Sequence, residues 1–403
     1  MNFKTLKELN VERKTVLLRA DLNVPMQNNT VTDTMRIDRL KPTIDYLLEK
    51  NAKIIIVSHY GRPNGKRVFN MSMGFIAPVL QTRWNVPVSF SPDTIGKHVK
   101  ESIAQLPPKS IVLLENVRFH KEEKANDDQF AKQLAELADI YINDAFSTSH
   151  RAHASMLGVT QYLPSAAGLL MEEELTALNA ALGSPEKPLL AVTGGSKIST
   201  KLGVLKHLIE KVDYLVLGGG MANTFLYAQG ISVGKSLCET DMIDTAQEII
   251  KTAEKEGCKI ILPLDVVVTK ELKESTFSSI MNIDDIRDDM MAVDIGPKSV
   301  AQIKDYLNKS KTVVWNGPLG VFENKPFDNG TNEIAAAVGK HTLEGKCSSI
   351  AGGGDTMAAL ENAGCQDQFS YVSTAGGAFL EWLEGKELPA IKPLRKNTLS
   401  NVA

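Results

Sequence analysis

The feature that most constrains the fold is a series of short apolar runs, each apolar on both faces and many ending in polar residues or glycines. The runs are TVLLRADL, AKIIIVSH, SIVLLENV, DIYINDAF, PLLAVTG, VDYLVLGGG, CKIILPLDVVV, TVVWNG and SSIAGGG. Such runs are typical of strands buried in parallel sheets, and longer segments of helical period separate them. This alternation predicts an α/β fold in which helices cover doubly wound parallel sheets.

The length of the chain predicts two domains, because 403 residues exceed what one hydrophobic core usually supports. A cleft between two such domains is then available for ligands. Residues 169–182 carry leucines at near-helical spacing and precede the breaker run GSPEKP, so they are expected to form a helix that connects the domains. The expected domains are residues 1–168 and 183–387.

Composition and charge exclude several classes of protein. The net charge of −3, from 45 basic and 48 acidic residues, provides no overall field that favours nucleic acid or an acidic membrane. The four cysteines form no Cys-x-x-Cys pair, which argues against structural zinc and against a disulfide framework. No uninterrupted apolar stretch of about 18 residues occurs, and no signal-like segment precedes the first strand, so a cytoplasmic protein is expected.

Basic side chains follow several of the strands predicted in the first half of the chain. They are Arg36, His59, Arg62, Arg118 and Arg151. They converge if the strands are parallel neighbours, and arginine forks match the oxygens of carboxylates and phosphates. Any one arginine alone is more simply a surface residue, but the set predicts a site for a small, highly anionic metabolite. Asp21 and Asn23 could bind a substrate hydroxyl or orient the arginines.

The histidines of this half allow more than one interpretation. His59 in SHYGRP could donate to a phosphate or could be a structural residue of a turn, and the sequence does not decide between these. His150 and His153 have the spacing of a metal-binding pair, but no third ligand or carboxylate motif accompanies them, so no metal is expected there.

Two triple-glycine clusters in the second half follow apolar strands and precede potential helix starts. They are Gly218–Gly220 and Gly352–Gly354. Glycine permits close approach of a ligand, and amides at a helix N-terminus favour phosphate. Asp355 and Thr356 follow the second cluster, which places a carboxylate where a phosphate-bound magnesium would need it. Tight turns between a strand and a helix are the alternative explanation for these glycines. Neither cluster completes the Gly-x-Gly-x-x-Gly pattern of a dinucleotide site.

Two lysines follow the strand LLAV. Lys197 and Lys201 in TGGSKISTKLG are four residues apart, so they are expected to share one face of a helix. Paired cations repel each other unless an anion lies between them, and a phosphoryl group in transfer is such an anion. Two exposed lysines on a helix are the alternative.

Taken together, these segments resemble the phosphoglycerate kinase family along the whole chain. The similar stretches include ADLNVP, SHYGRP, LLENVRFHKEE, DAFSTSHRAHAS, GGSKISTKLG, LGGGMANTF, DIGPKS, VVWNGPLGVFE, AGGGDT and STAGGAFLEWLEGKELPAI. The resemblance implies two similar α/β domains joined by a helix, a hinge motion, and a C-terminal tail, residues 388–403, that packs back on the first domain. It also implies a monomer.

The resemblance implies a role for each matching residue. The 3-phosphoglycerate moiety would be bound by Asp21, Asn23, Arg36, His59, Tyr60, Gly61, Arg62, Arg118 and Arg151. The nucleotide would be bound by Lys197, Lys201, Gly219, Gly220, Asn316, Glu323, Gly353, Gly354, Asp355 and Thr356, with Asp355 toward Mg²⁺. The catalytic set would be Arg36, Lys197, Lys201, Gly353 and Gly376.

The implied reaction is reversible, Mg²⁺-dependent phosphoryl transfer between 1,3-bisphosphoglycerate and ADP, which gives 3-phosphoglycerate and ATP in glycolysis and gluconeogenesis. Three neutral departures from the family pattern are Ser147 and Ser149, where Gly and Ala are more frequent, and Tyr60, where Leu is usual. A fourth, Ala375 in place of the first of three glycines, lies at the expected phosphate site. A nucleotide-dependent ligase or mutase and a non-catalytic scaffold are the competing hypotheses.

Overall fold

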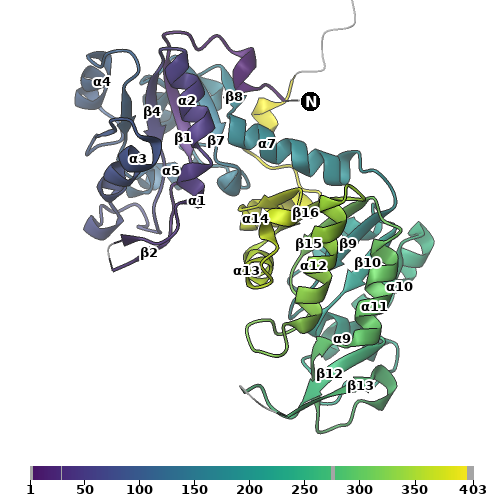
Figure 1. The fold of residues 1–403 in the computed structure, drawn as a ribbon. Helices are drawn as coiled ribbons and strands as arrows, with labels where there is room; N and C mark the ends of the chain where they lie inside the picture. Colours follow the sequence, from purple (N-terminus) through teal and green to yellow (C-terminus); the bar gives the residue numbers. More distant parts are fainter. Residues whose placement is uncertain (1–2, 29, 274–276, 397–403) are drawn as a thin grey trace, which may run out of the picture. The chain divides into compact units, whose positions relative to one another are not determined.

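The computed structural model describes residues 3–28, 30–273 and 277–396 of the chain. Its compact units are an N-terminal unit within residues 1–176 and 387–403, and a C-terminal unit of residues 177–386. Each unit has a six-stranded parallel sheet covered by helices (Figure 1). The predicted α/β fold class with two parallel-sheet units is therefore confirmed.

The N-terminal unit is built on the sheet β5-β6-β4-β1-β7-β8, in which all neighbouring strands are parallel. Its strands are β1 (Thr15–Ala20), β4 (Lys53–Val57), β5 (Ser89–Phe90), β6 (Ile111–Leu113), β7 (Ile140–Asp144) and β8 (Ser165–Ala167). Its helices are α1 (Met35–Asp38), α2 (Lys41–Glu49), α3 (Ala77–Trp84), α4 (Lys97–Ala104), α5 (Lys121–Ala125) and α6 (Asp128–Ala135). A two-stranded ribbon, β2 (Met26–Gln27) with β3 (Thr30–Val31), precedes α1.

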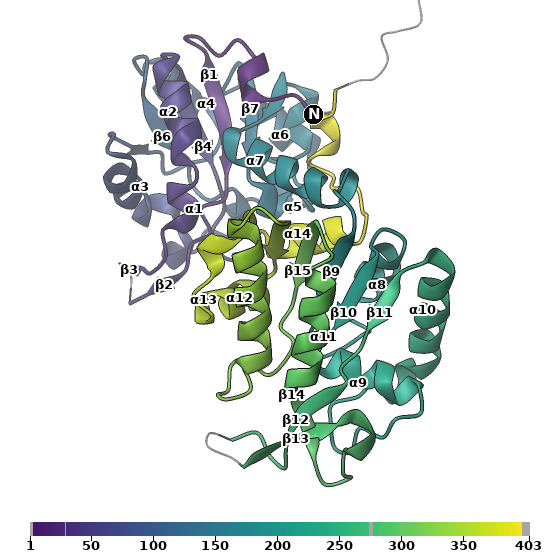
Figure 2. The ribbon, with the colours of Figure 1, turned by 45° about the vertical axis from the view of Figure 1, so that its right-hand side comes forward.

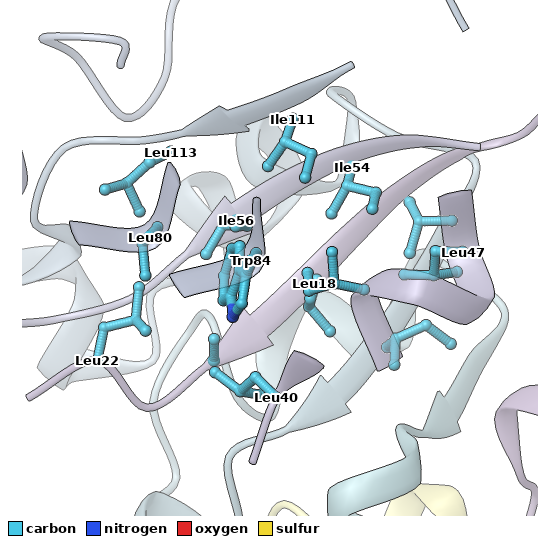
Figure 3. Packing of buried hydrophobic residues seen from close by; sticks show 14 of the residues in the cluster. Leu18, Leu22, Leu40, Leu47, Ile54, Ile56, Leu80, Trp84, Ile111 and Leu113 are labelled. Atoms are coloured by element: carbon cyan, nitrogen blue, oxygen red, sulfur yellow. The ribbon is translucent and has the colours of Figure 1, made fainter. Parts of the chain in front are cut away.

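The apolar runs form strands because both faces of each strand are buried. Leu18 of β1 lies with Ile54 and Ile56 of β4 in a core under α2 and α3 (Figure 3). Leu17 points to the opposite face and joins a second core with residues of α4 and α6. Because successive side chains of a strand point to opposite faces, a strand covered by helices on both sides must be apolar throughout.

The C-terminal unit repeats this design with the sheet β11-β10-β9-β15-β16-β17. Its strands are β9 (Leu189–Thr193), β10 (Tyr214–Leu217), β11 (Lys259–Ile261), β15 (Thr312–Asn316), β16 (Ser348–Gly352) and β17 (Tyr371–Ser373). The helices are α8 (Leu202–Ile209), α9 (Gly219–Ala228), α10 (Ile243–Glu256), α11 (Pro297–Leu307), α12 (Asn329–Leu343), α13 (Gly354–Asn362) and α14 (Gly376–Leu383). Helices α11 and α12 cover one face of the sheet (Figure 2).

The run CKIILPLDVVV forms two strands in different sheets, rather than one strand of the parallel sheet. Its first part is β11, and the chain then turns at Pro263 into β12 (Asp265–Thr269). Strand β12 is the centre of a small antiparallel sheet with β13 (Ser278–Asn282) and β14 (Met291–Ile295). Pro263 separates the two strands because proline has no N–H for a central ladder.

The order of strands locates the ligand-binding edge of each sheet. In the N-terminal unit the connections leave β1 in one direction toward β4 and return on the other side at β7. In the C-terminal unit the corresponding reversal lies between β9 and β15. Open α/β sheets bind ligands outside the carboxyl ends of the strands at such reversals. The loops that follow β1, β7, β9 and β15 are therefore the places to look for a site.

Helix α7 (Leu169–Leu178) contains the division between the two units and continues as a π-helical turn over Asn179–Gly183. The chain returns to the N-terminal unit after residue 386, where the amide of Ala390 donates to the carbonyl of Ser149 at 3.1 Å. None of the helices in the described part of the chain has the length and apolar character needed to cross a membrane.

Candidate active site

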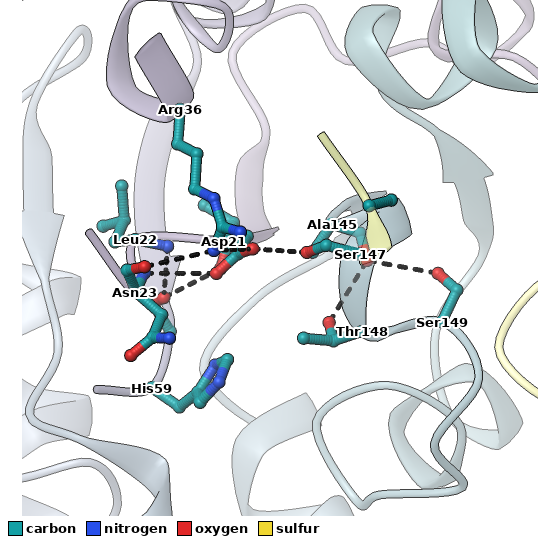
Figure 4. A network of polar contacts seen from close by, with 12 residues as sticks. Asp21, Leu22, Asn23, Arg36, His59, Ala145, Ser147, Thr148 and Ser149 are labelled. Carbon is teal, nitrogen blue, oxygen red and sulfur yellow. Dashed lines mark hydrogen bonds and ion pairs between the residues drawn. The ribbon is translucent and has the colours of Figure 1, made fainter. Parts of the chain in front are cut away.

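The loop after β1 in the N-terminal unit is organised around the carboxylate of Asp21, which is 8% exposed. Arg36 of α1 donates from Nη1 to Asp21 Oδ2 at 2.7 Å and to the carbonyl of Asn23 at 3.1 Å (Figure 4). The Asn23 amide donates to Asp21 Oδ1 at 3.1 Å, and Asn23 Oδ1 accepts the Gly61 amide at 3.0 Å. These bonds join the loops after β1 and β4, as predicted for neighbouring parallel strands.

His59 lies at the end of β4 and is 3% exposed. Nη2 of Arg19 lies 3.2 Å from His59 Nδ1. Because a guanidinium can only donate, Nδ1 accepts and the ring proton is on Nε2. Burial, reinforced by Arg19 and Arg118, holds the pKa of His59 well below its usual value. His59 is therefore a neutral imidazole with one N–H donor, which is compatible with either role that the sequence left open.

Arg118 follows β6 and is 6% exposed. Its Nη1 donates to the carbonyl of Gly61 at 2.8 Å, and its amide donates to Asn116 Oδ1 at 3.0 Å. Burial, together with Arg151 and Arg19, lowers the pKa of Arg118 to about 10. Neighbouring positive charges that lower one another's pKa favour the binding of an anionic ligand, because the ligand relieves their repulsion.

The remaining predicted residues of this unit lie in the same loops but differ in environment. Arg151 Nε donates to His150 Nε2 at 3.2 Å, whereas the side chain of Arg62 is exposed. The ring of Tyr60 packs edge-on against Phe75 with a centroid separation of 4.9 Å. Tyr60 therefore contributes to the loop through its carbonyl, which accepts from Asn116 Nδ2 at 2.8 Å.

The buried carboxylate of Glu123 interacts with two of the basic residues of this unit, His153 and Arg19. Glu123 is 0% exposed and accepts the amide and the hydroxyl of Ser155 at 2.9 and 2.7 Å. Burial raises the pKa of Glu123, but His153, Arg19 and Ser155 outweigh burial, so the pKa lies below its usual value.

Burial and Arg151 lower the pKa of His150 to about 4. Within residues 3–28, 30–273 and 277–396, no group of three potential ligands could hold a metal ion.

The C-terminal unit contains a cavity of about 320 Å³ at the carboxyl ends of its strands. Four of the predicted nucleotide-binding residues line it: Gly219, Gly220, Glu323 and Asp355. Gly219 has φ +67°, and a Cβ there would lie 2.6 Å from the Gly195 carbonyl oxygen, so only glycine fits. The rest of the wall is largely apolar, with Leu237, Val266, Leu272 and Met291 among its residues. Such a mixture is typical of a pocket for a planar ligand with a polar end.

The ends of β15 and β16 are joined by hydrogen bonds near this cavity. Asn316 is 3% exposed and donates from Nδ2 to the Gly352 carbonyl at 2.7 Å, whereas its Oδ1 has no hydrogen-bond partner in the structure. Thr356 Oγ1 donates to the same carbonyl at 2.9 Å and accepts the Gly317 amide at 2.7 Å. Gly353 has φ +104°, and Asp355 is exposed in the first turn of α13.

The prediction that Lys197 and Lys201 share a helix face is wrong, because α8 begins only at Leu202. Both lysines lie in the preceding loop, where Glu239 accepts the amide of Ser199 at 3.1 Å and its hydroxyl at 2.5 Å. This attachment replaces the bonds that would continue the helix. Lys197 is exposed. Lys201 Nζ donates to the carbonyls of Gly194 at 2.6 Å and Asn316 at 3.0 Å, and burial lowers its pKa to about 8 although Asp355 opposes this.

The start of α14 accommodates the substitution of glycine by Ala375. Ala375 has φ −102° and ψ 75°, outside the left-handed region that favours glycine, and its amide donates to Ser373 Oγ at 3.2 Å. A Cβ at Gly376 would meet no atom within 4 Å, so the space on the side-chain side of this residue is open. The departure at position 375 therefore leaves the helix N-terminus intact.

Several residues of these sites were missed in the sequence. Arg19 could most easily have been found from the sequence, because a charged residue inside an apolar strand that is buried on both faces needs a buried partner. Asp294 lines the cavity and accepts the Gly330 amide at 2.7 Å, and Thr193 is buried with an unpartnered Oγ1. Neither had a distinguishing pattern. Ser147 was noted only as a departure from the family.

Comparison with known proteins agrees with this geometry. A model of the phosphoglycerate kinase family matches residues 6–386. The phosphoglycerate kinase of Rhodospirillum centenum is 54% identical over 98% of this chain and 100% of its own length, and that of Sinorhizobium fredii is 51% identical over the same shares. The structure of phosphoglycerate kinase from Coxiella burnetii superposes with a TM-score of 0.91 at 45% identity, covering 97% of this chain and 98% of that one. The corresponding structure from Pyrococcus horikoshii gives 0.80 at 30% identity, with the same coverage. The chain belongs to the phosphoglycerate kinase family.

Proposed function

We propose that this kinase transfers a phosphoryl group reversibly between 1,3-bisphosphoglycerate and ADP, with the triose bound by the N-terminal unit and the nucleotide by the C-terminal unit. The observation that supports this assignment is the set of basic side chains at the strand ends of the N-terminal sheet, where Arg118 and Arg151 act on the neutral His59 and Arg36 is paired with Asp21 in the adjoining loop. A compact anion with a carboxylate and a phosphate matches these donors. The apolar cavity with Gly219 and Gly220 matches an adenine instead.

Each residue has a specific part in this assignment. On the triose side, Arg36, Arg62, Arg118 and Arg151 bind the anionic groups, His59 donates from Nε2, and Asp21 with Asn23 binds the hydroxyl. Tyr60 and Gly61 shape the loop through their backbone. On the nucleotide side, Gly219 and Gly220 contact the adenine, Glu323 binds the ribose, and Lys197, Lys201, Asn316, Gly353, Gly354 and Thr356 surround the phosphates.

The chemistry requires no general base, because the attacking group in the ATP-consuming direction is a carboxylate that is ionised at pH 7. Catalysis then consists of in-line positioning and of neutralising charge on the equatorial oxygens of the transferred group. Arg36 and Lys201 supply that charge, with Lys197 and the amides at Gly353 and Gly376 as further donors.

The donor set around the phosphates fits a Mg²⁺ ion. The exposed carboxylate of Asp355 in the first turn of α13 is a hard oxygen ligand, and Mg²⁺ typically binds through one or two carboxylates together with substrate phosphates. The ion supplies further neutralisation of phosphate charge when it is bound.

We also propose functional boundaries close to the compact units. Residues 1–168 with 388–403 form the triose-binding domain, residues 183–387 form the nucleotide-binding domain, and residues 169–182 connect them as the hinge. Residues 1–2 and 397–403 of the first domain lie outside the described part of the chain. A cytoplasmic monomer that binds neither nucleic acid nor membrane completes the proposal.

The test is a coupled assay in which 3-phosphoglycerate is phosphorylated by MgATP and the acyl phosphate is consumed reductively, measured as loss of NADH. We expect turnover that requires magnesium and falls strongly in Lys201→Ala. A folded chain that binds nucleotide without turnover would favour the scaffold hypothesis, and a requirement for a second acceptor would favour a ligase.

A further inference from the structure

Ser147 lies at the point where the two loops of the N-terminal reversal meet. It belongs to the 3₁₀ turn Phe146–Thr148 that follows β7, and β7 is the neighbour of β1. Its hydroxyl donates to Oδ2 of Asp21 through a short hydrogen bond. The hydroxyl thus connects segments that are 126 residues apart in the chain.

The carboxylate of Asp21 is held from two opposite sides (Figure 4). Arg36 reaches Oδ2 from α1 at 2.7 Å, and Ser147 reaches the same oxygen from the turn after β7. Oδ1 accepts the Asn23 amide at 3.1 Å. A carboxylate oxygen has two lone-pair sites, so Oδ2 is fully occupied and Oδ1 keeps one site for a ligand hydroxyl.

The residues on either side of Ser147 are buried and hydrogen-bonded, which holds the backbone that carries its hydroxyl. Phe146 and Thr148 on either side are 4% and 5% exposed. The hydroxyls of Thr148 and Ser149 both donate back to the Ala145 carbonyl, at 3.1 and 3.2 Å. The Ser149 carbonyl in turn accepts the Ala390 amide at 3.1 Å. Of these three neighbouring hydroxyls, Ser147 is the one that bonds to the loop after β1.

We infer that Ser147 is a positioning residue for the triose site, acting through Asp21. Its hydroxyl balances the pull of Arg36 on Oδ2 and fixes the rotation of the carboxylate, so that Oδ1 faces the ligand before the ligand arrives. A half-occupied Oδ2 would let the carboxylate turn toward the guanidinium of Arg36. This inference rests on the proposed binding of 3-phosphoglycerate at Asp21.

The experiment measures the Kd for 3-phosphoglycerate by calorimetry in the full chain, so that its readout does not depend on turnover. Ser147→Ala and Ser147→Gly both remove the hydroxyl, and we expect each to raise this Kd about tenfold, the lower end of the effect of one lost hydrogen bond to a charged group. The KM for MgATP should stay within twofold of the wild-type value. Ser149→Ala is the matched control, because it removes a hydroxyl from the same turn without touching Asp21, and its Kd should not change.

A double-mutant cycle separates positioning through Asp21 from a general effect on the turn. In the Asp21→Asn background, Ser147→Ala should change the Kd less than twofold, because the carboxylate it positions is gone. An equal loss in both backgrounds would overturn the inference, as would a wild-type Kd in Ser147→Ala. Failure of the wild-type chain to turn over, with 3-phosphoglycerate still bound, would contradict the proposed reaction and leave the effect of Ser147 on binding intact.

Discussion

Lys201 is held by hydrogen bonds to the protein's own backbone. Its ammonium donates to two carbonyls at the ends of β9 and β15, and burial lowers its pKa to about 8. A phosphate oxygen near these strand ends would compete with the carbonyls for the ammonium. Its negative charge would also offset the free-energy cost of burying the charged lysine. The lysine is thus positioned close to its predicted ligand.

This environment predicts a decline of activity at high pH. The folded-state pKa of Lys201 is below that of a free lysine, so the charged form is lost as pH rises through about 8. Because kcat/KM reports groups of the free enzyme, we expect kcat/KM for MgATP to fall above about pH 8. In Lys201→Arg the guanidinium stays charged, so its lower kcat/KM should remain level over this range. Lys197→Arg should retain the decline, and a decline in both variants would contradict the assignment.

Arg36 should matter more for the rate than for binding. It is half-buried beside Asp21 and can bring a planar pair of donors to the transferred group. We expect Arg36→Ala to lower kcat by about two orders of magnitude, as is typical of removing a donor to transition-state charge, and to raise the KM for 3-phosphoglycerate less than tenfold. Arg83→Ala is the control. Arg83 of α3 is paired outside the site with Asp38, which belongs to α1, the helix that carries Arg36. An effect confined to KM would refute the catalytic role.

At the scale of residues, the sequence located the charged side chains at the strand ends better than the groups that orient them. Arg118 and Arg151 could be found because arginines after buried strands must lie at the sheet edge. The role of Arg19 in setting the tautomer of His59 depends on a contact across two strands, and the bond from Ser147 to Asp21 depends on which strand neighbours β1. Strand order is a tertiary property that the local pattern does not contain.

At the scale of elements, the start of α7 depends on a buried carboxylate. Asp144 at the end of β7 is 1% exposed, accepts the Met171 amide at 2.8 Å, and accepts the Thr43 hydroxyl at 2.6 Å. Thr43 Oγ1 in turn accepts the Leu169 amide at 3.0 Å. Two amides of the first helical turn, which have no intrahelical partner, are thereby satisfied.

The charge of Asp144 should make stability depend on pH. Burial raises its pKa to about 7, although Thr43 and Met171 oppose this. The folded state then holds a proton that the unfolded state loses near pH 4, so this group's contribution to stability falls as pH rises from about 4 to 7. We expect Asp144→Asn, which keeps an acceptor for Met171, to gain stability relative to the wild type over that interval, by a few kcal/mol in urea unfolding.

Asp139→Asn is the matched control for this prediction. Asp139 lies at the other end of β7, accepts the Thr15 amide at 2.8 Å and is exposed. Because this side chain is exposed, its replacement should not reproduce the gain in stability that is expected for Asp144→Asn between about pH 4 and 7. Parallel pH curves for the wild type and Asp144→Asn would show that the carboxylate is not buried as the structure describes. The other carboxylate with a pKa raised to about 7, Asp294, cancels in this comparison.

Elements with a strong apolar run were predicted, whereas those defined by their partners were not. Strands β5 and β8 have two and three residues and exist because β6 and β7 offer them an edge. The start of α8 was misplaced because the spacing of Lys197 and Lys201 resembles a helix, while Glu239, distant in sequence, holds Ser199 outside it. Side chains from other segments decide such boundaries.

At the scale of the whole molecule, both units use parallel sheets whose ligand-binding loops follow from strand order. The number of units followed from the length of the chain. The antiparallel sheet of β12, β13 and β14 did not, because its middle strand continues an apolar run begun in another sheet. That sheet nevertheless forms part of the cavity of the C-terminal unit, through Val266 of β12 and Met291 of β14.

The reaction requires the two bound substrates to come within bonding distance while water is excluded, since an acyl phosphate hydrolyses readily. Because the predicted ligands of the two substrates belong to different units, we expect the units to close about α7 when both substrates are bound. The π-helical turn Asn179–Gly183 at the end of α7 is a position where such a motion could be absorbed. We expect small-angle X-ray scattering to show a smaller radius of gyration with 3-phosphoglycerate and MgADP together than with either alone. This pair contains no transferable phosphoryl group, so the complex persists during the measurement. An unchanged radius with both sites saturated would contradict closure and would require another way of excluding water.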